Sequence, residues 1–154
     1  MTTFETALRW KEGKQADLKA RENPLLEVAT PPEFGGPPQT WCPEELLVAS
    51  VESCLLSTLL YFADRFHLAL ADYSSRSKGV LGKTPEGLRF SGVEVRIDVI
   101  WKDKESLEKA ASLRLKEKLE KYCPVSASLK CLVSLQMEMR EAAANGADRR
   151  PGTG

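Results

Sequence analysis

The four cysteines, at positions 42, 54, 123 and 131, are the residues of this chain with the widest chemistry. A thiolate is a nucleophile that peroxides oxidise, and two thiols can form a transient disulfide. No C-x-x-C pair occurs and His67 is the only histidine, so the usual ligand spacing of a zinc site is missing. These residues allow thiol redox chemistry without requiring it, and we expect no metal or other cofactor.

A cysteine hydrolase needs a base beside its thiol. His67 follows Cys54 by thirteen residues, about 20 Å along a helix, and such a histidine more often ends a helix. A peroxidase has no such need, because the peroxide O–O bond is weak. It requires a thiolate, a cation that stabilises the thiolate, and an apolar channel. The sequence provides thiols and apolar residues for the first and third of these requirements.

The cysteines differ in what their neighbours indicate. Cys54 lies among apolar residues, where a free cysteine is usually a buried small hydrophobe. Cys123 precedes Pro124, a residue typical of the first helical position, so it is expected near the N-cap of a helical turn. Exposed amides there stabilise a thiolate and lower its pKa, which suits a resolving cysteine. Cys42 shares this feature, whereas Cys131 is expected to be buried in a strand.

A long apolar helix is predicted to hold Cys54. Pro43 suits its first position, and Glu44 and Glu45 place negative charge at the positive end of the helix dipole. Over residues 46 to about 68, apolar side chains fall on nearly every side, as in a helix buried in a core. A dimer that packs two such helices between its sheets would bury them.

Strands and shorter helices are predicted before and after this helix. Alternation, turn residues and amphipathic spacing indicate strands at 4–10, 16–20, 25–29, 71–81, 88–101 and 131–139, and helices at 103–122 and 125–129. The proline- and glycine-rich stretch 31–38 is a shaped loop. The order β-β-β-α-β-β-α-α-β belongs to the α+β class. We expect one domain over residues 1–141 and a disordered tail over 142–154.

Charge and apolar content argue against several classes of protein. The chain has 22 basic and 22 acidic residues, with no run of four basic ones, which argues against a nucleic-acid binder. The N-terminus lacks the apolar region of a secretory signal, and the longest apolar stretch is shorter than the ~20 residues of a membrane span. We therefore expect a soluble, cytoplasmic protein, in which a disulfide is transient and catalytic.

Three motifs resemble those of the OsmC/Ohr family, the osmotically inducible protein C and organic hydroperoxide resistance proteins. Pro43–Cys54 (PEELLVASVESC) is similar to the family's first-cysteine helix, which opens with P-E-x-L. Tyr122–Leu129 (YCPVSASL) is similar to its second-cysteine segment, C-P-x-S-x-x-L. Pro32–Gly36 (PEFGG) matches the loop before the first motif, and the similarity covers roughly residues 5–140.

The resemblance implies an OsmC-like fold, with antiparallel sheets packed around the central helix of an intertwined homodimer and an active site at the subunit interface. It also implies a thiol-dependent peroxidase for organic hydroperoxides. Cys54 would be oxidised to a sulfenic acid, and Cys123 would condense with it to a disulfide. A dithiol, often lipoyl-linked in the family, would reduce that disulfide. Glu44 matches the family glutamate that orients an arginine toward the reactive sulfur.

Two features depart from the family pattern. No residue matches the arginine, and Lys14 and Arg21 are the candidates for its role. Glu44 and Cys54 are ten residues apart, about 15 Å along a continuous helix. Either the helix breaks between them, or Glu44 serves the Cys54 of a partner subunit, and the need for a dimer favours the partner.

Two other functions fit the same sequence. The fold could bind a small apolar or thiol-reactive ligand without turnover, or it could form a structural dimer with inert cysteines. The number of free thiols left after exposure to a hydroperoxide separates both from a peroxidase, since only a peroxidase loses Cys54 and Cys123 to a disulfide.

Overall fold

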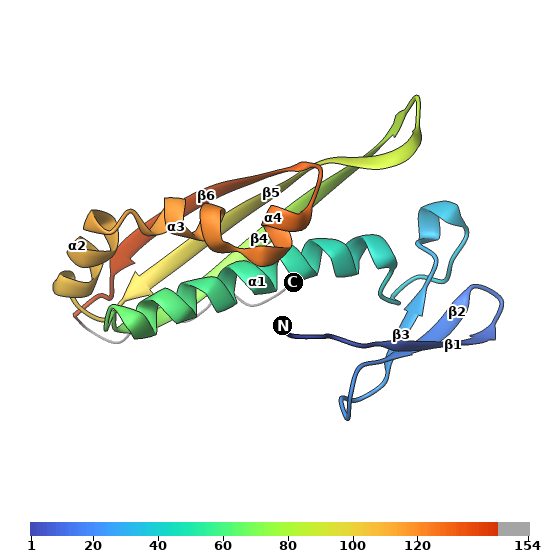
Figure 1. The fold of residues 1–154 in the computed structure, drawn as a ribbon, viewed down its shortest axis with the longest axis horizontal. Coiled ribbons are helices and arrows are strands. Elements are labelled where there is room, and N and C mark those ends of the chain that lie inside the picture. Colours follow the sequence, from blue (N-terminus) through green and yellow to red (C-terminus); the bar gives the residue numbers. More distant parts are fainter. Residues whose placement is uncertain (145–154) are drawn as a thin grey trace. The chain divides into compact units, whose positions relative to one another are not determined.

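The computed structural model of the chain describes residues 1–144. These residues divide into two units, Met1–Ser50 and the chain from Val51 on, whose elements are labelled in Figure 1. The single domain over 1–141 stays a prediction, and the predicted tail lies outside the described residues from position 145 on.

The first unit contains a three-stranded antiparallel sheet. Strands β1 (Ala7–Glu12), β2 (Gln15–Lys19) and β3 (Leu26–Ala29) are neighbours in space in the order of the sequence. Gly13 joins β1 to β2 with a φ of 48°, a left-handed conformation that glycine adopts at little cost. The three strands were expected from alternation and turn residues, and all three are present.

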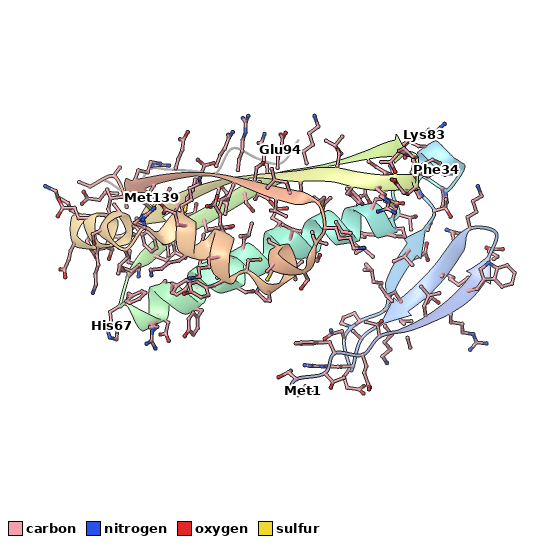
Figure 2. All side chains as sticks on the ribbon, turned by 45° about the horizontal axis from the view of Figure 1, so that its top comes forward. Met1, Phe34, His67, Lys83, Glu94 and Met139 are labelled. Carbon is pink, nitrogen blue, oxygen red and sulfur yellow. The ribbon has the colours of Figure 1, made fainter. Side chains whose placement is uncertain are left out.

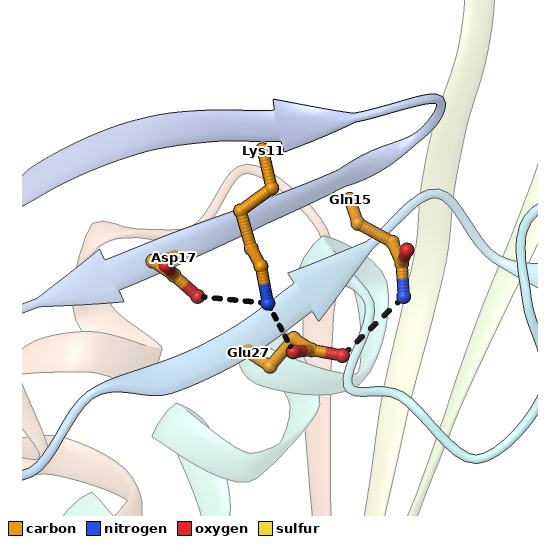
Figure 3. A network of polar contacts seen from close by, with 4 residues as sticks. All are labelled: Lys11, Gln15, Asp17 and Glu27. Carbon is orange, nitrogen blue, oxygen red and sulfur yellow. Dashed lines mark hydrogen bonds and ion pairs between the residues drawn. The ribbon is translucent and has the colours of Figure 1, made fainter.

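A charged network crosses this sheet (Figure 3). Asp17 on β2 and Glu27 on β3 are directly opposite each other, and like charges in that position destabilise a sheet. Lys11 Nζ on β1 lies 3.7 Å from an Asp17 oxygen and 2.7 Å from a Glu27 oxygen. Gln15 donates a further hydrogen bond to Glu27 at 3.3 Å. The lysine therefore offsets the repulsion between the two carboxylates.

The loop predicted over 31–38 contains a short 3-10 helix, η1 (Pro32–Phe34). Gly35 ends this turn with a φ of 80°. A Cβ atom on Gly36 would lie 1.5 Å from the Thr30 carbonyl oxygen. No larger residue fits at position 36 unless the backbone moves, so the shape of the loop depends on this glycine.

Helix α1 (Pro43–Arg65) runs without a break through Cys54 (Figure 1). Its buried residues share one face and are Val51, Leu55, Thr58, Leu59, Phe62 and Ala63. Leu60 and Tyr61 are exposed, so this chain by itself buries one face of a helix that is apolar on nearly every side. By length and composition α1 could cross a membrane, a test that the core helix of a soluble protein also passes. Because one face of α1 is buried against the rest of the chain, α1 resembles the core helix of a globular domain.

The C-terminus of α1 lies three residues before its predicted end near position 68. His67 adopts a left-handed conformation, with a φ of 53°, and is labelled at this end of the helix in Figure 2. Its amide donates to the Asp64 carbonyl at 3.1 Å, and the Leu68 amide donates to the Ala63 carbonyl at 2.8 Å. These are the two bonds of a Schellman motif. His67 therefore terminates the helix, as its place in the sequence indicates.

The second unit is built on a sheet in the order β4-β5-β6. Strands β4 (Leu70–Thr84) and β5 (Gly87–Trp101) form a long antiparallel hairpin, and β6 (Leu132–Glu141) pairs with β5 in parallel. The prediction of antiparallel sheets is therefore wrong for the β5–β6 pair. The physical reason is the crossover: helices between β5 and β6 return the chain to the starting end of β5, as a parallel pair requires.

The two faces of this sheet differ. Along β5 the buried residues alternate with charged ones and are Val93, Val95, Ile97, Val99 and Trp101. Figures 1 and 2 show the helices on one side of the sheet, and Glu94 points away from them. The period-two pattern of β5 is thus that of a sheet with one wet face.

The helix predicted over 103–122 is two helices, α2 (Lys104–Ser112) and α3 (Leu115–Tyr122). Arg114 separates them with a φ of 52°. Ala110 and Leu115 are both fully buried, although five positions on a straight helix differ by about 140°. The left-handed residue turns both side chains to the core, which amphipathic spacing alone could not indicate. A short helix, α4 (Pro124–Ser128), follows as predicted.

Candidate active site

The structure brings Cys54 and Cys123 together. Cys54 is half-buried on α1, and Cys123 is fully buried at the junction of α3 and α4, where it is the N-cap of α4. Cys123 lies close enough to Cys54 to raise the pKa of the Cys54 thiol, and both thiols are free. The Ser126 hydroxyl lies 3.1 Å from the Cys123 sulfur. Two neighbouring free thiols are the partners from which a disulfide forms.

The surroundings of Cys54 favour its neutral form. Burial is the main cause that raises the pKa of this thiol above its ordinary value, and the adjoining Cys123 raises it further. The Val125 amide, on the first turn of α4, hydrogen-bonds Cys54 and lowers its pKa, though by less than burial raises it. Thr58, whose hydroxyl also donates to the Cys54 carbonyl at 2.8 Å, acts in the same direction. The amide of the short helix therefore serves Cys54, whereas the sequence led us to expect such amides to serve Cys123.

The raised pKa of Cys54 predicts how its reactivity depends on pH. Below its pKa the thiolate fraction grows about tenfold per pH unit, and the pKa lies above that of free cysteine, which is about 8.5. The rate of Cys54 alkylation by iodoacetamide should therefore still rise above pH 8.5, where free cysteine levels off. Peptide mass spectrometry of the reduced protein follows Cys54 alone, and a cysteine peptide is the control. A plateau below pH 8 would contradict the prediction.

A cavity of about 660 Å³ opens beside Cys54. Helix α1 lines it along one stripe with Cys54, Ser57, Thr58, Tyr61, Phe62 and Arg65, and Phe66 follows directly after the helix. Lys118 and Tyr122 of α3 and Pro124 of α4 complete the lining. The volume is that of sites that hold small organic ligands, and aromatic rings make up much of the wall. The cavity is the candidate for the apolar channel that the sequence analysis expects beside the reactive thiol.

Glu44 lies at the opposite end of α1 from this cavity. Because α1 is continuous from Pro43 to Arg65, a helix break does not bring Glu44 to the Cys54 of the same chain, and about 15 Å of helix separates the two residues. One carboxylate oxygen of Glu44, Oε2, is buried and has no hydrogen-bond partner among the described residues. Glu44 also raises the pKa of the Cys42 thiol, for which burial is the main cause.

Cys42 and Glu45 cap the N-terminus of α1. The Cys42 amide donates to a Glu45 carboxylate oxygen at 3.1 Å, and the Glu45 amide donates to the Cys42 sulfur at 3.5 Å. These are the reciprocal bonds of a capping box, with sulfur in place of a hydroxyl oxygen. Cys42 therefore has a structural explanation. Cys131 lies one residue before β6 and is half-buried, so its predicted place inside a buried strand is wrong.

The two candidate cations of the sequence, Lys14 and Arg21, both lie in the first unit. Lys14 Nζ donates to the Phe34 carbonyl oxygen, and the Arg21 guanidinium lies 5.7 Å from the centre of the Phe4 ring. Within residues 1–144 no group of three or more His, Cys, Asp or Glu side chains could hold a metal ion.

A family model of OsmC-like proteins matches residues 36–138 of the chain. The chain belongs to the OsmC-like family. The resemblance drawn from the cysteine motifs is thereby confirmed. YmaD, an uncharacterized protein of Bacillus subtilis, is 26% identical over 117 residues, which are 75% of this chain and 78% of YmaD.

Solved structures share the fold. An OsmC-like protein from Vibrio cholerae superposes with a TM-score of 0.76 at 18% identity, over 90% of this chain and 100% of the other. An organic hydroperoxide resistance protein, OsmC, from Legionella pneumophila has a TM-score of 0.68 at 23% identity, over 90% and 97% of the two chains. OhrB of Bacillus subtilis is also an organic hydroperoxide resistance protein. It superposes with a TM-score of 0.59 at 19% identity, over 90% of this chain and 98% of OhrB. The α+β, OsmC-like fold is thus confirmed, with a mixed sheet.

Several residues around Cys54 escaped the sequence analysis. The Val125 amide, the Thr58 hydroxyl and the Ser126 hydroxyl contact the two cysteines, and Arg65 and Lys118 are the cations that line the cavity. The sequence contained a signal for the cavity residues of α1, among them Thr58 and Arg65. These residues follow Cys54 at intervals of three and four positions, so they share one face of the helix.

Proposed function

We propose that this protein is a thiol-dependent peroxidase that reduces organic hydroperoxides through Cys54 and Cys123. The observation that carries the proposal is the nearness of two free thiols, one of which lines a cavity with aromatic walls. Membership of the OsmC-like family supports it, since members of similar fold are named organic hydroperoxide resistance proteins. We place the reaction in the cytoplasm, where thiols are kept reduced.

The proposed cycle has three steps. The Cys54 thiolate attacks an oxygen of the hydroperoxide, so that an S–O bond forms, the O–O bond breaks and the organic group leaves as an alcohol. The Cys123 thiol then attacks the Cys54 sulfenic acid, which releases water and leaves a Cys54–Cys123 disulfide. A dithiol, such as a lipoyl group, reduces this disulfide and is itself oxidised to a cyclic disulfide.

The proposed active unit is a homodimer with the active site at the subunit interface. Glu44 cannot reach Cys54 along its own continuous helix, and its buried Oε2 atom has no partner among the described residues. A buried carboxylate oxygen of this kind calls for a donor or a cation. We assign Glu44 the role of orienting a cation beside the Cys54 of a partner subunit, where the cation would offset part of the rise in the Cys54 pKa that burial causes.

A thiol count tests the proposal. One equivalent of cumene hydroperoxide should remove two of the four thiols, and peptide mapping should find them as a Cys54–Cys123 disulfide. Cys42 and Cys131 in the same molecule are the controls and should stay reduced. Finding Cys42 or Cys131 in the disulfide would overturn the assigned pair.

The second candidate is an OsmC-like protein that binds a ligand in this cavity without efficient turnover. The raised pKa of Cys54 favours it, because a neutral thiol is a poor nucleophile. Under this reading all four thiols survive the same treatment, although the cavity still binds an apolar ligand.

A further inference from the structure

The cavity beside Cys54 has an aromatic wall. The Phe62 ring lies 5.2 Å from that of Tyr61 and 5.7 Å from that of Tyr122, in edge-to-face arrangements, and 6.0 Å from the stacked Phe66 ring. All four aromatic residues line the cavity. An extended apolar ligand that enters toward Cys54 therefore lies along these rings.

The two cations of the lining lie at the far end of this wall. Lys118 Nζ is 5.9 Å from the centre of the Phe62 ring and 6.0 Å from that of Phe66. Arg65 follows Cys54 by eleven residues, which is about 16 Å along α1. No aspartate or glutamate belongs to the lining found in the described part of the chain, so this end of the cavity carries positive charge.

Two basic residues near Lys118 are held in ion pairs, whereas Lys118 and Lys121 lie over aromatic rings. Arg114 pairs with Glu117 at 3.0 Å, and Lys116 pairs with Glu120 at 3.3 Å. Within residues 1–144 no ion pair is found for Lys118 or Arg65. Lys118 is half-buried, and its charged amine lies over the aromatic rings that line the cavity. A charge held in this way is available to a ligand.

These cations do not serve the thiol itself. The groups that chiefly shift the pKa of Cys54 are its burial, Val125, Cys123 and Thr58, and neither Lys118 nor Arg65 is among them. For Arg65 the distance along α1 agrees, because a charge about 16 Å away is screened in water at physiological salt.

We infer that Lys118 and Arg65 bind the carboxylate of an elongated apolar acid, and so select acidic over esterified hydroperoxides. The inference rests on the proposed peroxidase function and assigns these two residues to substrate recognition. The carboxylate would lie near Lys118 and Arg65, the apolar chain along the aromatic wall, and the hydroperoxide group at Cys54. A ligand that reaches from Cys54 to Arg65 spans about 16 Å between its two polar groups.

The test compares linoleic acid hydroperoxide with its methyl ester, because the pair differs in charge and hardly in shape. The wild-type protein should show a KM about tenfold lower for the acid, as one charge-assisted hydrogen bond provides. Lys118→Met should raise the KM for the acid about tenfold, with kcat nearly unchanged. The KM values for the ester and for cumene hydroperoxide should move less than about twofold.

Lys116→Met is the matched control. Lys116 lies on the same helix, pairs with Glu120 and does not line the cavity, so its replacement should leave all three KM values unchanged. Methionine keeps an apolar stem over the rings in Lys118→Met, and thermal unfolding of each variant checks that the fold is intact. Adding Arg65→Gln to Lys118→Met should abolish the preference for the acid.

Several outcomes separate the two proposals. Equal KM values for acid and ester in the wild type would overturn the inference while leaving the peroxidase intact. A preference for dihydrolipoate over dihydrolipoamide that Lys118→Met removes, without an effect on the hydroperoxides, would assign the cations to the reductant and also overturn it. If even cumene hydroperoxide is not reduced, the peroxidase proposal fails. In that case, the affinities of the Cys54→Ser protein for palmitate and for methyl palmitate still decide whether the cavity selects a carboxylate.

Discussion

Replacement of Cys54 with serine is expected to abolish the reduction of organic hydroperoxides, by roughly a thousandfold or more. A serine hydroxyl has nearly the shape of the thiol but is not ionised at neutral pH, and only a thiolate attacks the peroxide oxygen efficiently. Cys54 is half-buried, so the substitution should hardly change the free energy of unfolding. The assay follows the consumption of cumene hydroperoxide in the presence of a dithiol.

Cys131→Ser is the matched control for this variant. Cys131 is also half-buried and free, but it lies before β6 and does not line the cavity. Its replacement should leave the rate unchanged. Retention of activity in Cys54→Ser, or its loss in Cys131→Ser, would mean that a different cysteine attacks the peroxide.

Much of the fold could be predicted because it follows from local patterns. The alternation of apolar and charged residues in β5 has a period of two, and it survives intact in the sheet. The start of α1 at Pro43 and its end near His67 also have local causes, a helix-opening proline and a left-handed residue. Such features need no knowledge of distant contacts.

The errors in the fold arise where distant contacts decide. The direction of β6 depends on where the crossover helices place the chain, and the residues of β6 alternate similarly in either direction. The break at Arg114 depends on the core, which takes both Ala110 and Leu115. An amphipathic pattern allows a straight helix there, and only packing against the sheet requires two.

The site shows the same division. Cys54 and Cys123 stand in recognisable motifs, but tertiary structure brings them near each other and turns the Val125 amide toward Cys54. The cavity stripe of α1 is hidden in the sequence because apolar residues cover the other sides of the helix too. Lys118 is one of many charged residues on an amphipathic helix, and only its position over the rings of Phe62 and Phe66 distinguishes it.

The raised pKa of Cys54 gives Cys123 a particular importance. If the thiolate fraction of Cys54 is small, the first oxidation is slow, and the sulfenic acid must be removed before another peroxide reaches it. In the proposed cycle the neighbouring Cys123 thiol does this, because an attack within one molecule has a far higher effective concentration than attack by a second molecule.

Replacement of Cys123 with serine is therefore expected to stop disulfide formation and to leave Cys54 as a sulfenic acid after one equivalent of peroxide. Dimedone labelling followed by peptide mass spectrometry should locate the adduct at Cys54. Further peroxide should convert the sulfenic acid to a sulfinic acid, which a dithiol cannot reduce. The number of turnovers before inactivation should fall roughly tenfold or more, since each cycle exposes the sulfenic acid to overoxidation.

Ser126→Ala is the control for Cys123→Ser, because it removes the hydroxyl 3.1 Å from the Cys123 sulfur and leaves both thiols in place. Disulfide formation should persist in Ser126→Ala. If Cys123→Ser instead forms a disulfide between Cys54 and Cys42 or Cys131, then Cys123 is not the resolving residue and its place near Cys54 is only packing. A trapped sulfenic acid at Cys54, together with an intact disulfide in Ser126→Ala, assigns the resolving role to the Cys123 thiol itself rather than to its hydrogen bond.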